Sequence, residues 1–421
     1  MDSDPRAFLL RLFHTAVSAA SAAHCVPPNL PARSRGRTLV IGAGKAAAAM
    51  AKAVEDHWEG PLSGLVITRY GHGVPCRAIE VVEAGHPVPD EAGLAAAKQM
   101  LALVQGLTKD DLVLALISGG GSSLLALPAP GITLDDKQAI TRALLKSGAP
   151  IAEINCVRKH LSAVKGGRLA LAAQPATVVS LIISDVPGDD PETVASGPTG
   201  PDATTREQAL AILNKHAIAI PPAVKAWLEN PLSETPKPGH AAFAKGESRI
   251  IARARDALAA ASAAAEAMGL SVIDLGDAIE GEARLVARDH AELALRYRAE
   301  NKSCVLISGG ETTVTVKGGG RGGRNSEYLL ALALALDGAS GIWAIACDTD
   351  GIDGTEMNAG ATIGPDTLAR GMNLGADAKA ALARNDSYGF FQSLGDLVET
   401  GPTRTNINDF RAILVRPSQP G

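Results

Sequence analysis

Residues 113–125 read Val-Leu-Ala-Leu-Ile-Ser-Gly-Gly-Gly-Ser-Ser-Leu-Leu, and this stretch determines the fold class that the sequence predicts. A short apolar run that ends at glycine is typical of a strand buried on both faces of a parallel sheet. Three successive glycines let backbone N–H groups crowd together, and the neighbouring serines add hydroxyl donors. A helix that begins at Ser122 would point its positive end at the same turn. The turn is therefore predicted to bind an anion such as phosphate, and a strand-to-helix turn without a ligand is the alternative.

The composition excludes several classes of protein. With 421 residues, 46% of them apolar and 20% charged, the chain is long enough for two or three globular domains. The net charge is −5 and no basic stripe is present, which argues against nucleic-acid binding. The N-terminus is acidic and no apolar run approaches roughly 18 residues, so we expect neither a secretion signal nor a membrane span. Five scattered cysteines without a C-x-x-C pair predict free thiols in a reducing cytoplasm.

A lysine follows the glycines of an earlier strand. The predicted strand 37–41 leads into Gly42-Ala43-Gly44-Lys45, and the six residues from Gly42 formally satisfy the G-x-G-x-x-A dinucleotide fingerprint. The next strand, 65–68, ends in Arg69-Tyr70 and lacks the acid that would grip a ribose, so the match is weak. A lysine that opens a helix beside two glycines suits a carboxylate or a phosphate, and a solvated surface lysine is the alternative.

Residues 135–172 are predicted to be largely helical and carry several basic side chains. In one continuous helix, Arg158, Ser162 and Lys165 would fall at positions i, i+4 and i+7 and share one face. Such a face, followed by two glycines, could clamp a phosphate. A basic solvated stripe is an equally good interpretation.

Two further predicted strands end in acidic loops. Strand 176–184 is followed by Asp185 and Asp189, and strand 341–346 is followed by Asp348 and Asp350. Acids at the carboxyl ends of buried strands lie where α/β folds bind ligands. Carboxylates there suit Mg²⁺ or a base for a hydroxyl group, and turn-forming aspartates are the alternative.

The proline-rich segment 221–238 predicts a boundary between two α/β domains, residues 1–240 and 241–421. Beyond it the alternation of strands and helices restarts. Strand 303–308 ends in Ser308-Gly309-Gly310-Glu311-Thr312, which repeats the Ile-Ser-Gly-Gly of the first glycine turn. The recurrence predicts a second anion-binding turn, although it is too short to establish a duplication.

The segment Gly318–Glu327 combines five glycines with Arg321 and Arg324. Such a segment cannot contribute to a core, and its arginines offer planar donors while the backbone is free to close over a ligand. A disordered glycine loop is the alternative. The apolar residues of 326–336 predict a helix that is buried on all sides.

Six motifs occur in order between residues 40 and 355: Gly-Ala-Gly-Lys-Ala, Ile-Ser-Gly-Gly-Gly-Ser-Ser, Ile-Ser-Asp-Val-Pro-Gly-Asp, Ser-Gly-Gly-Glu-Thr-Thr, Gly-Gly-Arg-Asn and Asp-Thr-Asp-Gly-Ile-Asp-Gly. With them the chain resembles, over nearly its whole length, the glycerate 2-kinases that carry a DUF4147 domain and a C-terminal MOFRL domain. The resemblance implies a Rossmann-like N-terminal domain, a smaller α/β MOFRL domain and an active site in the cleft between them. It also implies transfer of the γ-phosphoryl group of ATP to the 2-hydroxyl of D-glycerate, with Mg²⁺ or another divalent cation.

Matched to the motifs of this family, Lys45, Asp189 and Arg324 are the implied catalytic residues. We infer that Lys45 and Arg324 hold the glycerate carboxylate and the γ-phosphate, while Asp189 orients or deprotonates the 2-hydroxyl. Nucleotide phosphates are assigned to Ser118, Gly119, Gly120, Gly121, Ser122, Ser123, Gly309, Gly310, Glu311 and Thr312. The substrate is assigned to Lys45, Arg158, Arg321, Arg324 and Asn325. A metal ion is assigned to Asp185, Asp189, Asp348 and Asp350.

Two other functions stay open. Some members of the family carry the label hydroxypyruvate reductase, and an NAD(P)H-dependent reductase would fit the weak fingerprint at Gly42. A non-catalytic sensor of nucleotides or organic acids is the third hypothesis. The expected partners are ATP and D-glycerate, in the cytoplasm, without nucleic acid or membrane, and a homodimer is left open.

Overall fold

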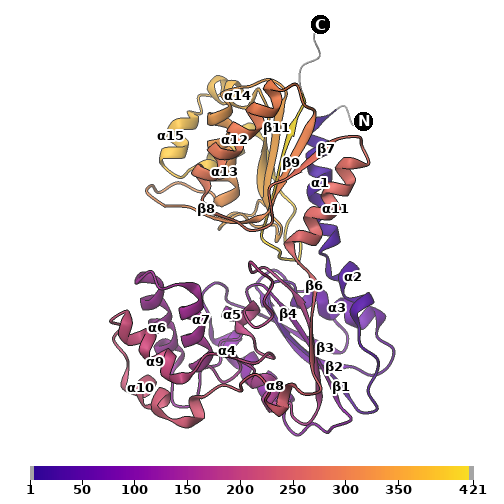
Figure 1. The fold of residues 1–421 in the computed structure, drawn as a ribbon, viewed down its shortest axis with the longest axis vertical. Helices are drawn as coiled ribbons and strands as arrows, with labels where there is room; N and C mark the ends of the chain where they lie inside the picture. Colours follow the sequence, from indigo (N-terminus) through magenta and orange to yellow (C-terminus); the bar gives the residue numbers. More distant parts are fainter. Residues whose placement is uncertain (1–3, 417–421) are drawn as a thin grey trace. The chain divides into compact units, whose positions relative to one another are not determined.

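The computed structural model describes residues 4–416, which form two compact units, each with its own sheet (Figure 1). Residues 22–251 form the N-terminal unit, and residues 4–21 together with 252–416 form the C-terminal unit. This division differs from the predicted domains, 1–240 and 241–421, at both ends of the N-terminal unit.

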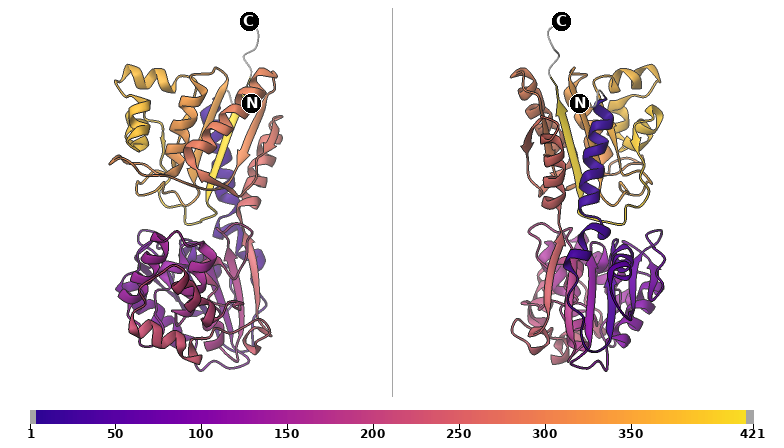
Figure 2. Two further views of the ribbon diagram at one scale, coloured as in Figure 1. Left: turned by 60° about the vertical axis from the view of Figure 1, so that its left-hand side comes forward. Right: turned by 90° about the vertical axis from the view of Figure 1, so that its right-hand side faces the viewer.

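Helix α1 (Pro5–Ala19) accounts for the first difference. Phe8, Leu9, Leu12 and Phe13 on its apolar face are completely buried, and the ring of Phe13 lies 5.9 Å from that of Phe410. Figure 2 shows α1 alongside the last strand, β14 (Asp409–Val415), and helix α11 (Ala254–Glu266). The first helix therefore completes the core of the C-terminal unit.

A late strand accounts for the second difference. Strand β6 (Glu247–Ala252) is an edge strand of the N-terminal sheet, so the chain leaves this unit only after it. Two of the prolines that predicted a linker begin helices instead, because proline fits the first turn of a helix, where its missing N–H is not needed. Pro222 opens α10 (Pro222–Glu229), and Pro231 opens a short 3₁₀ turn.

The N-terminal sheet has the strand order β3-β2-β1-β4-β5-β6. This is the Rossmann order, and the first five strands run parallel. The apolar run that predicted a doubly covered strand is β4, and all seven of its residues are buried. The five strands are β1 (Thr38–Ala43), β2 (Ser63–Arg69), β3 (Ile79–Ala84), β4 (Leu112–Ser118) and β5 (Thr177–Ile183).

The segment predicted as one long helix is broken twice. The first part ends at Lys146, and Gly148 turns the chain with a φ of +73° before α7 begins after Pro150. Gly166 and Gly167 adopt positive φ angles before the last part. Helix α7 ends at His160, so Ser162 and Lys165 do not share a helix face with Arg158, and that prediction is wrong. The helices of this unit are α2 (Ala22–Cys25), α3 (Ala47–His57), α4 (Glu91–Leu103), α5 (Gly121–Leu124), α6 (Leu134–Lys146), α7 (Ile151–His160), α8 (Arg168–Ala172), α9 (Arg206–Lys215) and α10.

The sheet of the C-terminal unit has the order β13-β12-β11-β14-β9-β7 and is mixed. Only β7 and β9 pair in parallel among its strand pairs, and β14 lies at the centre, between β11 and β9. Its strands before β14 are β7 (Ser271–Asp274), β9 (Cys304–Ser308), β11 (Ile342–Asp348), β12 (Gly360–Ile363) and β13 (Leu397–Val398). A separate parallel pair consists of β8 (Ile279–Glu282) and β10 (Gly310–Thr313).

Helix α13 (Arg324–Leu336) is the buried helix that the sequence predicts, with ten of its thirteen residues buried. It packs on α12 and on β11 and β12 (Figure 1), which covers both its apolar sides. The remaining helices are α12 (Ala283–Ala299), α14 (Thr367–Asn373), α15 (Ala378–Ala383) and α16 (Ser387–Leu394).

All five cysteines are free thiols, as predicted, and four of them are buried. Within residues 4–416, every helix is too short or too polar to cross a membrane.

Candidate functional site

In the N-terminal unit, the glycine turns after β1 and β4 are joined at the point where the strand order reverses. The two strands are parallel neighbours, and β1 pairs Ala43 with Ile117 of β4. Beyond the strands, the Lys45 N–H donates to the Gly119 carbonyl at 2.8 Å, and the Ala46 N–H donates to Ser118 Oγ at 3.0 Å. Open α/β sheets bind their ligands at such a switch point, so the two predicted turns lie where this fold class places a site.

Close packing explains the glycines of these turns. Gly44 has a φ of +138°, and a Cβ there would lie 2.1 Å from Ser118 Oγ. Gly120 has a φ of +81°, and a Cβ there would lie 3.0 Å from His86 Nε2 and 3.3 Å from Lys45 Cγ. The partly exposed side chains of Lys45 and His86 therefore flank the second turn. His86 was not among the predicted site residues.

Helix α5, which follows the second turn, begins at Gly121, one residue before the predicted start, and contains only four residues. Ser122 Oγ lies 2.8 Å from Ser196 Oγ, and the buried Lys165 donates to the carbonyls of Ser122 and Leu125, both at 2.8 Å. A helix this short contributes little dipole, so the turn owes its conformation to side-chain contacts rather than to a long helix.

The acidic loop after β5 contains three residues with left-handed backbone that are not glycine: Asp189 at a φ of +53°, Ala195 at +53° and Ser196 at +63°. Such conformations cost about 1–3 kcal/mol each and cluster at functional sites. A Cβ on Gly121 would lie 2.7 Å from the Ala195 Cβ, so this loop packs directly on the second glycine turn.

The acids of this loop differ from one another. Asp185 and Asp189 are partly exposed after the end of β5. Asp190 instead accepts hydrogen bonds from the Glu192 N–H at 3.0 Å and the Thr193 hydroxyl at 2.7 Å, which is the turn-forming role. Only Asp185 and Asp189 are therefore retained as candidates.

In the C-terminal unit, Arg324 opens α13 and is surrounded by carboxylates. Its Nε donates to both oxygens of Asp409, at 2.8 and 3.0 Å. Its Nη1 and Nη2 donate to Glu311 and Asp348, both at 2.9 Å. Burial lowers the pKa of Arg324, but these three carboxylates outweigh burial and hold its pKa well above the ordinary value. The guanidinium is thus a permanent charge that already has anionic partners.

Neighbouring predicted residues serve this cluster rather than an open surface. Asn325 is completely buried, and its amide donates to Asp409 at 2.8 Å. Asp353 accepts hydrogen bonds from the Asn325 N–H, the Ser326 N–H and the Ser326 hydroxyl at 2.7–2.9 Å, so it caps the start of α13. Asp350 and Asp348 are buried, and Asp348 Oδ1 also accepts from the Asp350 N–H at 3.0 Å.

The second Ser-Gly-Gly motif does not repeat the first structurally. Gly309 joins β9 directly to β10, whereas the first motif leads into a helix. Arg411 donates to the Gly309 carbonyl at 3.1 Å and to the Thr312 hydroxyl at 3.2 Å. Gly310 has no room for a Cβ, which would lie 2.3 Å from the Ile279 nitrogen. These residues hold two strands together, and of the four only Glu311 reaches the candidate site.

The glycine-rich loop before α13 is packed down and not open. A Cβ on Gly318 would lie 2.3 Å from the Arg384 carbonyl oxygen, and one on Gly323 would lie 2.3 Å from Asp353 Oδ1. Arg321 places its guanidinium 4.5 Å from the centre of the Tyr388 ring. The glycines therefore allow close approach of neighbouring segments, which differs from the predicted freedom to close over a ligand.

No group of three or more His, Cys, Asp or Glu side chains among residues 4–416 is arranged to hold a metal ion. Mg²⁺ in phosphotransferases commonly needs only one or two carboxylates, with water and phosphate oxygens as its other ligands. Single acids beside the glycine turns fit such a nucleotide-bound ion, so Asp185, Asp189, Asp348 and Asp350 stay predictions.

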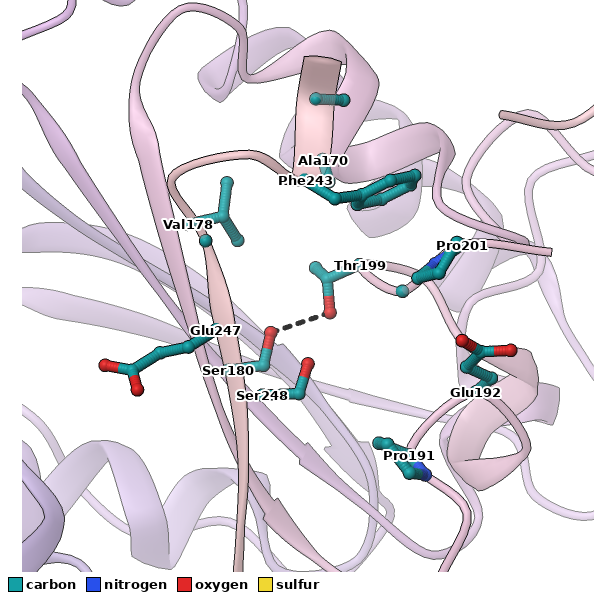
Figure 3. A pocket seen from close by; sticks show the side chains of 13 residues that line it. Ala170, Val178, Ser180, Pro191, Glu192, Thr199, Pro201, Phe243, Glu247 and Ser248 are labelled. Carbon is teal, nitrogen blue, oxygen red and sulfur yellow. Dashed lines mark hydrogen bonds between the residues drawn. The ribbon is translucent and has the colours of Figure 1, made fainter. Parts of the chain in front are cut away.

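A pocket of about 230 Å³ in the N-terminal unit lies away from these residues (Figure 3). It is lined by Val178 and Ser180 of β5, by Glu192, and by Phe243 beyond α10. The hydroxyl groups of Ser180 and Thr199 lie 2.7 Å apart, so the two polar groups at the centre of the pocket are hydrogen-bonded to each other. None of the predicted site residues lines it.

Comparisons with known proteins agree with this architecture. A family model described as a domain of unknown function, DUF4147, matches residues 8–229, and the model of the MOFRL family matches residues 304–409. The D-glycerate 2-kinase of Thermotoga maritima is 41% identical over 406 residues, which cover 95% of this chain and 96% of that protein. The crystal structure of glycerate kinase from Thermotoga maritima matches with a TM-score of 0.89 at 39% identity, covering 97% of this chain and 99% of that chain. An Agrobacterium vitis protein provisionally named a hydroxypyruvate reductase is 55% identical over 421 residues, covering 98% of this chain and 95% of that protein.

Proposed function

The chain belongs to the family that joins a DUF4147 domain to a MOFRL domain, and we propose that it transfers the γ-phosphoryl group of ATP to the 2-hydroxyl of D-glycerate. The products are 2-phospho-D-glycerate and ADP. One observation carries the proposal: two glycine turns and Lys45 are tied together at the switch point of a Rossmann sheet. Five free thiols suit the reducing cytoplasm as the compartment of this reaction.

Phosphoryl transfer demands positioning and charge neutralisation more than covalent chemistry from the protein. Backbone donors of the Ser118–Ser123 turn bind nucleotide phosphates, and Lys45, whose Cγ lies beside Gly120, neutralises an oxyanion. Asp189 orients or deprotonates the attacking hydroxyl, and its left-handed backbone supports a functional role for this loop. Asp185 or Asp189 would hold Mg²⁺ in part, and the ion would neutralise the charge that develops on the phosphate oxygens.

Arg324 has a more specific role than the sequence suggested. Its Nε and Nη2 donate to Asp409 and Asp348, which are buried. Its Nη1 donates to Glu311, whose side chain is 52% exposed. Nη1 is therefore the donor that an incoming oxyanion can take over, because Glu311 can turn into solvent while the other two carboxylates keep the guanidinium in place.

The alternative function, a hydroxypyruvate reductase, is favoured by the name of the Agrobacterium vitis relative. Against it, β2 ends in Arg69, followed by Tyr70, where a dinucleotide-binding sheet needs an acid for the ribose. The two functions predict different products from the same protein.

The decisive experiment identifies the product. After incubation with ATP, Mg²⁺ and D-glycerate, phosphorus NMR should show 2-phosphoglycerate, and omission of D-glycerate should abolish ADP release. Oxidation of NADH or NADPH by hydroxypyruvate, with no phosphoglycerate formed, would instead establish the reductase.

A substitution then tests the site. Lys45→Ala should lower turnover by about 30- to several-thousand-fold, which corresponds to losing one charged contact with the transition state. Lys98→Ala, which removes an exposed lysine from α4, is the matched control and should keep full activity. An unchanged melting temperature in Lys45→Ala separates a role in the reaction from a role in folding.

A further inference from the structure

Three cationic side chains gather behind the second glycine turn. They are Lys137 of α6, Arg158 of α7 and Lys165, which precedes α8. Lys137 and Lys165 are only 8% and 1% exposed. Burial, and then repulsion by Arg158, lowers the pKa of Lys137 to about 7. Burial, and then repulsion by Lys137 and Arg158, lowers the pKa of Lys165 well below its usual value. Geometry places them in one region: α6 packs against α7, and the residues after α7 are bonded to the segment after the turn, since the Ala129 N–H donates to the Leu161 carbonyl at 3.1 Å.

Backbone carbonyls, which carry no net charge, are the only hydrogen-bond partners of the two lysine ammonium groups among residues 4–416. Lys165 donates to the carbonyls of Ser122 and Leu125, both at 2.8 Å, and Lys137 donates to the carbonyl of Ala126 at 3.2 Å. Both lysines thus hold the segment that directly follows the glycines of the turn.

Arg158 makes no side-chain hydrogen bond or ion pair with any residue that the structure describes, although it is partly buried. Burial lowers its pKa, and no carboxylate offsets that effect. Buried charges in proteins are normally paired, because an uncompensated charge costs several kcal/mol. A partly buried arginine without a carboxylate partner, beside two buried lysines whose ammonium groups meet only neutral carbonyls, is thus a site that an anion would complete.

We propose that Arg158, with Lys137 and Lys165 behind it, forms an anion subsite at the Ser122–Ala126 segment that takes a phosphate or carboxylate group of a small molecule. The two lysines are positioning residues, since they fix the turn through its carbonyls. Arg158 supplies the donors, because its planar guanidinium can hold two oxygens of one group. The proposal rests on the proposed function only for the source of the anion, either nucleotide phosphate or the carboxylate of glycerate.

Arg158→Gln tests the subsite by calorimetric titration of the full chain with three separate probes: inorganic phosphate, ADP and D-glycerate. Loss of a charged hydrogen-bonding group should weaken binding of the phosphate probe by about 10- to 100-fold. A matching loss for ADP alone assigns the subsite to the nucleotide, and a matching loss for D-glycerate alone assigns it to the substrate. Because no turnover is needed, the phosphate titration stands even if the kinase assay fails.

The same variant distinguishes binding from structural support. Without ligand, Arg158→Gln removes repulsion from two buried lysines, so its melting temperature should stay equal to that of the parent or rise. Arg158→Lys should bind the probes with intermediate affinity, because it keeps the charge but not the fork of donors. Arg142→Gln, which removes an exposed arginine from α6, is the matched control and should change neither quantity. Unchanged affinity for all three probes in Arg158→Gln, or a fall in its melting temperature, would overturn the proposal.

Discussion

Arg324 Nε donates to both carboxylate oxygens of Asp409, at 2.8 and 3.0 Å, although the two residues are far apart in the sequence. Arg324 is the first residue of α13, and Asp409 is the first residue of the central strand β14. Asp409 also accepts hydrogen bonds from Arg411 and from the Asn325 amide. One buried carboxylate therefore joins the start of the buried helix to the middle of the sheet.

Asp409→Asn should destabilise the protein by about 3–5 kcal/mol, the usual cost of breaking a buried ion pair by removing one partner. The substitution leaves the buried Arg411 and the partly exposed Arg324 with less counter-charge. Urea unfolding followed by circular dichroism measures the effect. Asp366→Asn is the control, because Asp366 pairs with Arg370 on the surface and is 66% exposed, so its loss should cost less than about 1 kcal/mol. Equal losses in the two variants would show that the Asp409 cluster contributes no more than a surface pair.

Gly44→Ala should disrupt the paired turns of the N-terminal unit. An alanine at a φ of +138° is strained, and its Cβ would lie 2.1 Å from Ser118 Oγ, which the Ala46 N–H holds in place. The strain costs about 1–2 kcal/mol and the overlap about 1–3 kcal/mol more. The melting temperature and the kinase turnover should both fall.

Gly131→Ala separates these two terms. Gly131 also has a positive φ, +80°, but no atom lies within 4 Å of the position of its Cβ. The Gly131→Ala variant should therefore be destabilised only by the backbone strain, about 1–2 kcal/mol, and should keep its turnover. If Gly131→Ala were as damaging as Gly44→Ala, backbone strain rather than contact with Ser118 would explain the glycine.

The fold was predictable where local pattern and buried environment agree. The apolar run that becomes β4 and the apolar helix α13 are buried as the sequence predicts, because each is too apolar to face water at all. The pairing of α1 with β14 was not predictable, because an amphipathic helix shows that it has a buried face but not what covers it. The same limit placed the domain boundary before β6, since the sequence of a strand does not show which of two sheets the strand joins.

The candidate site was predictable in residue type more than in role. Lys45 and the Ser118–Ser123 turn lie together because both end parallel strands at one edge of the sheet. Asp409 and Lys137 lay outside the prediction, since neither belongs to a glycine motif and only the tertiary structure brings them to their partners. For His86, its place just after β3 was the one available signal.

The buried lysine of α6 makes stability depend on pH. Burial, and then repulsion from Arg158, lowers the pKa of Lys137 to about 7 in the folded protein, whereas an unfolded lysine keeps its proton up to about pH 10.5. Between these values the unfolded chain binds the extra proton, so stability rises with pH in this window and is lowest below pH 7. Relative to Lys137→Met, the parent should gain about 1.4 kcal/mol per pH unit from pH 7 upward.

Urea unfolding at pH 7, 8 and 9 measures this difference, and taking it between two variants cancels the other titrating groups that they share. Lys146→Met removes an exposed lysine from the same helix, and its free energy of unfolding should change with pH as that of the parent does. Inorganic phosphate should flatten the slope, because an anion at Arg158 favours the charged lysine in the folded state and raises its pKa. If the free energies of unfolding of the parent and of Lys137→Met changed equally with pH across this range, Lys137 would keep its proton in the folded protein. The charges behind the glycine turn would then be compensated without a ligand.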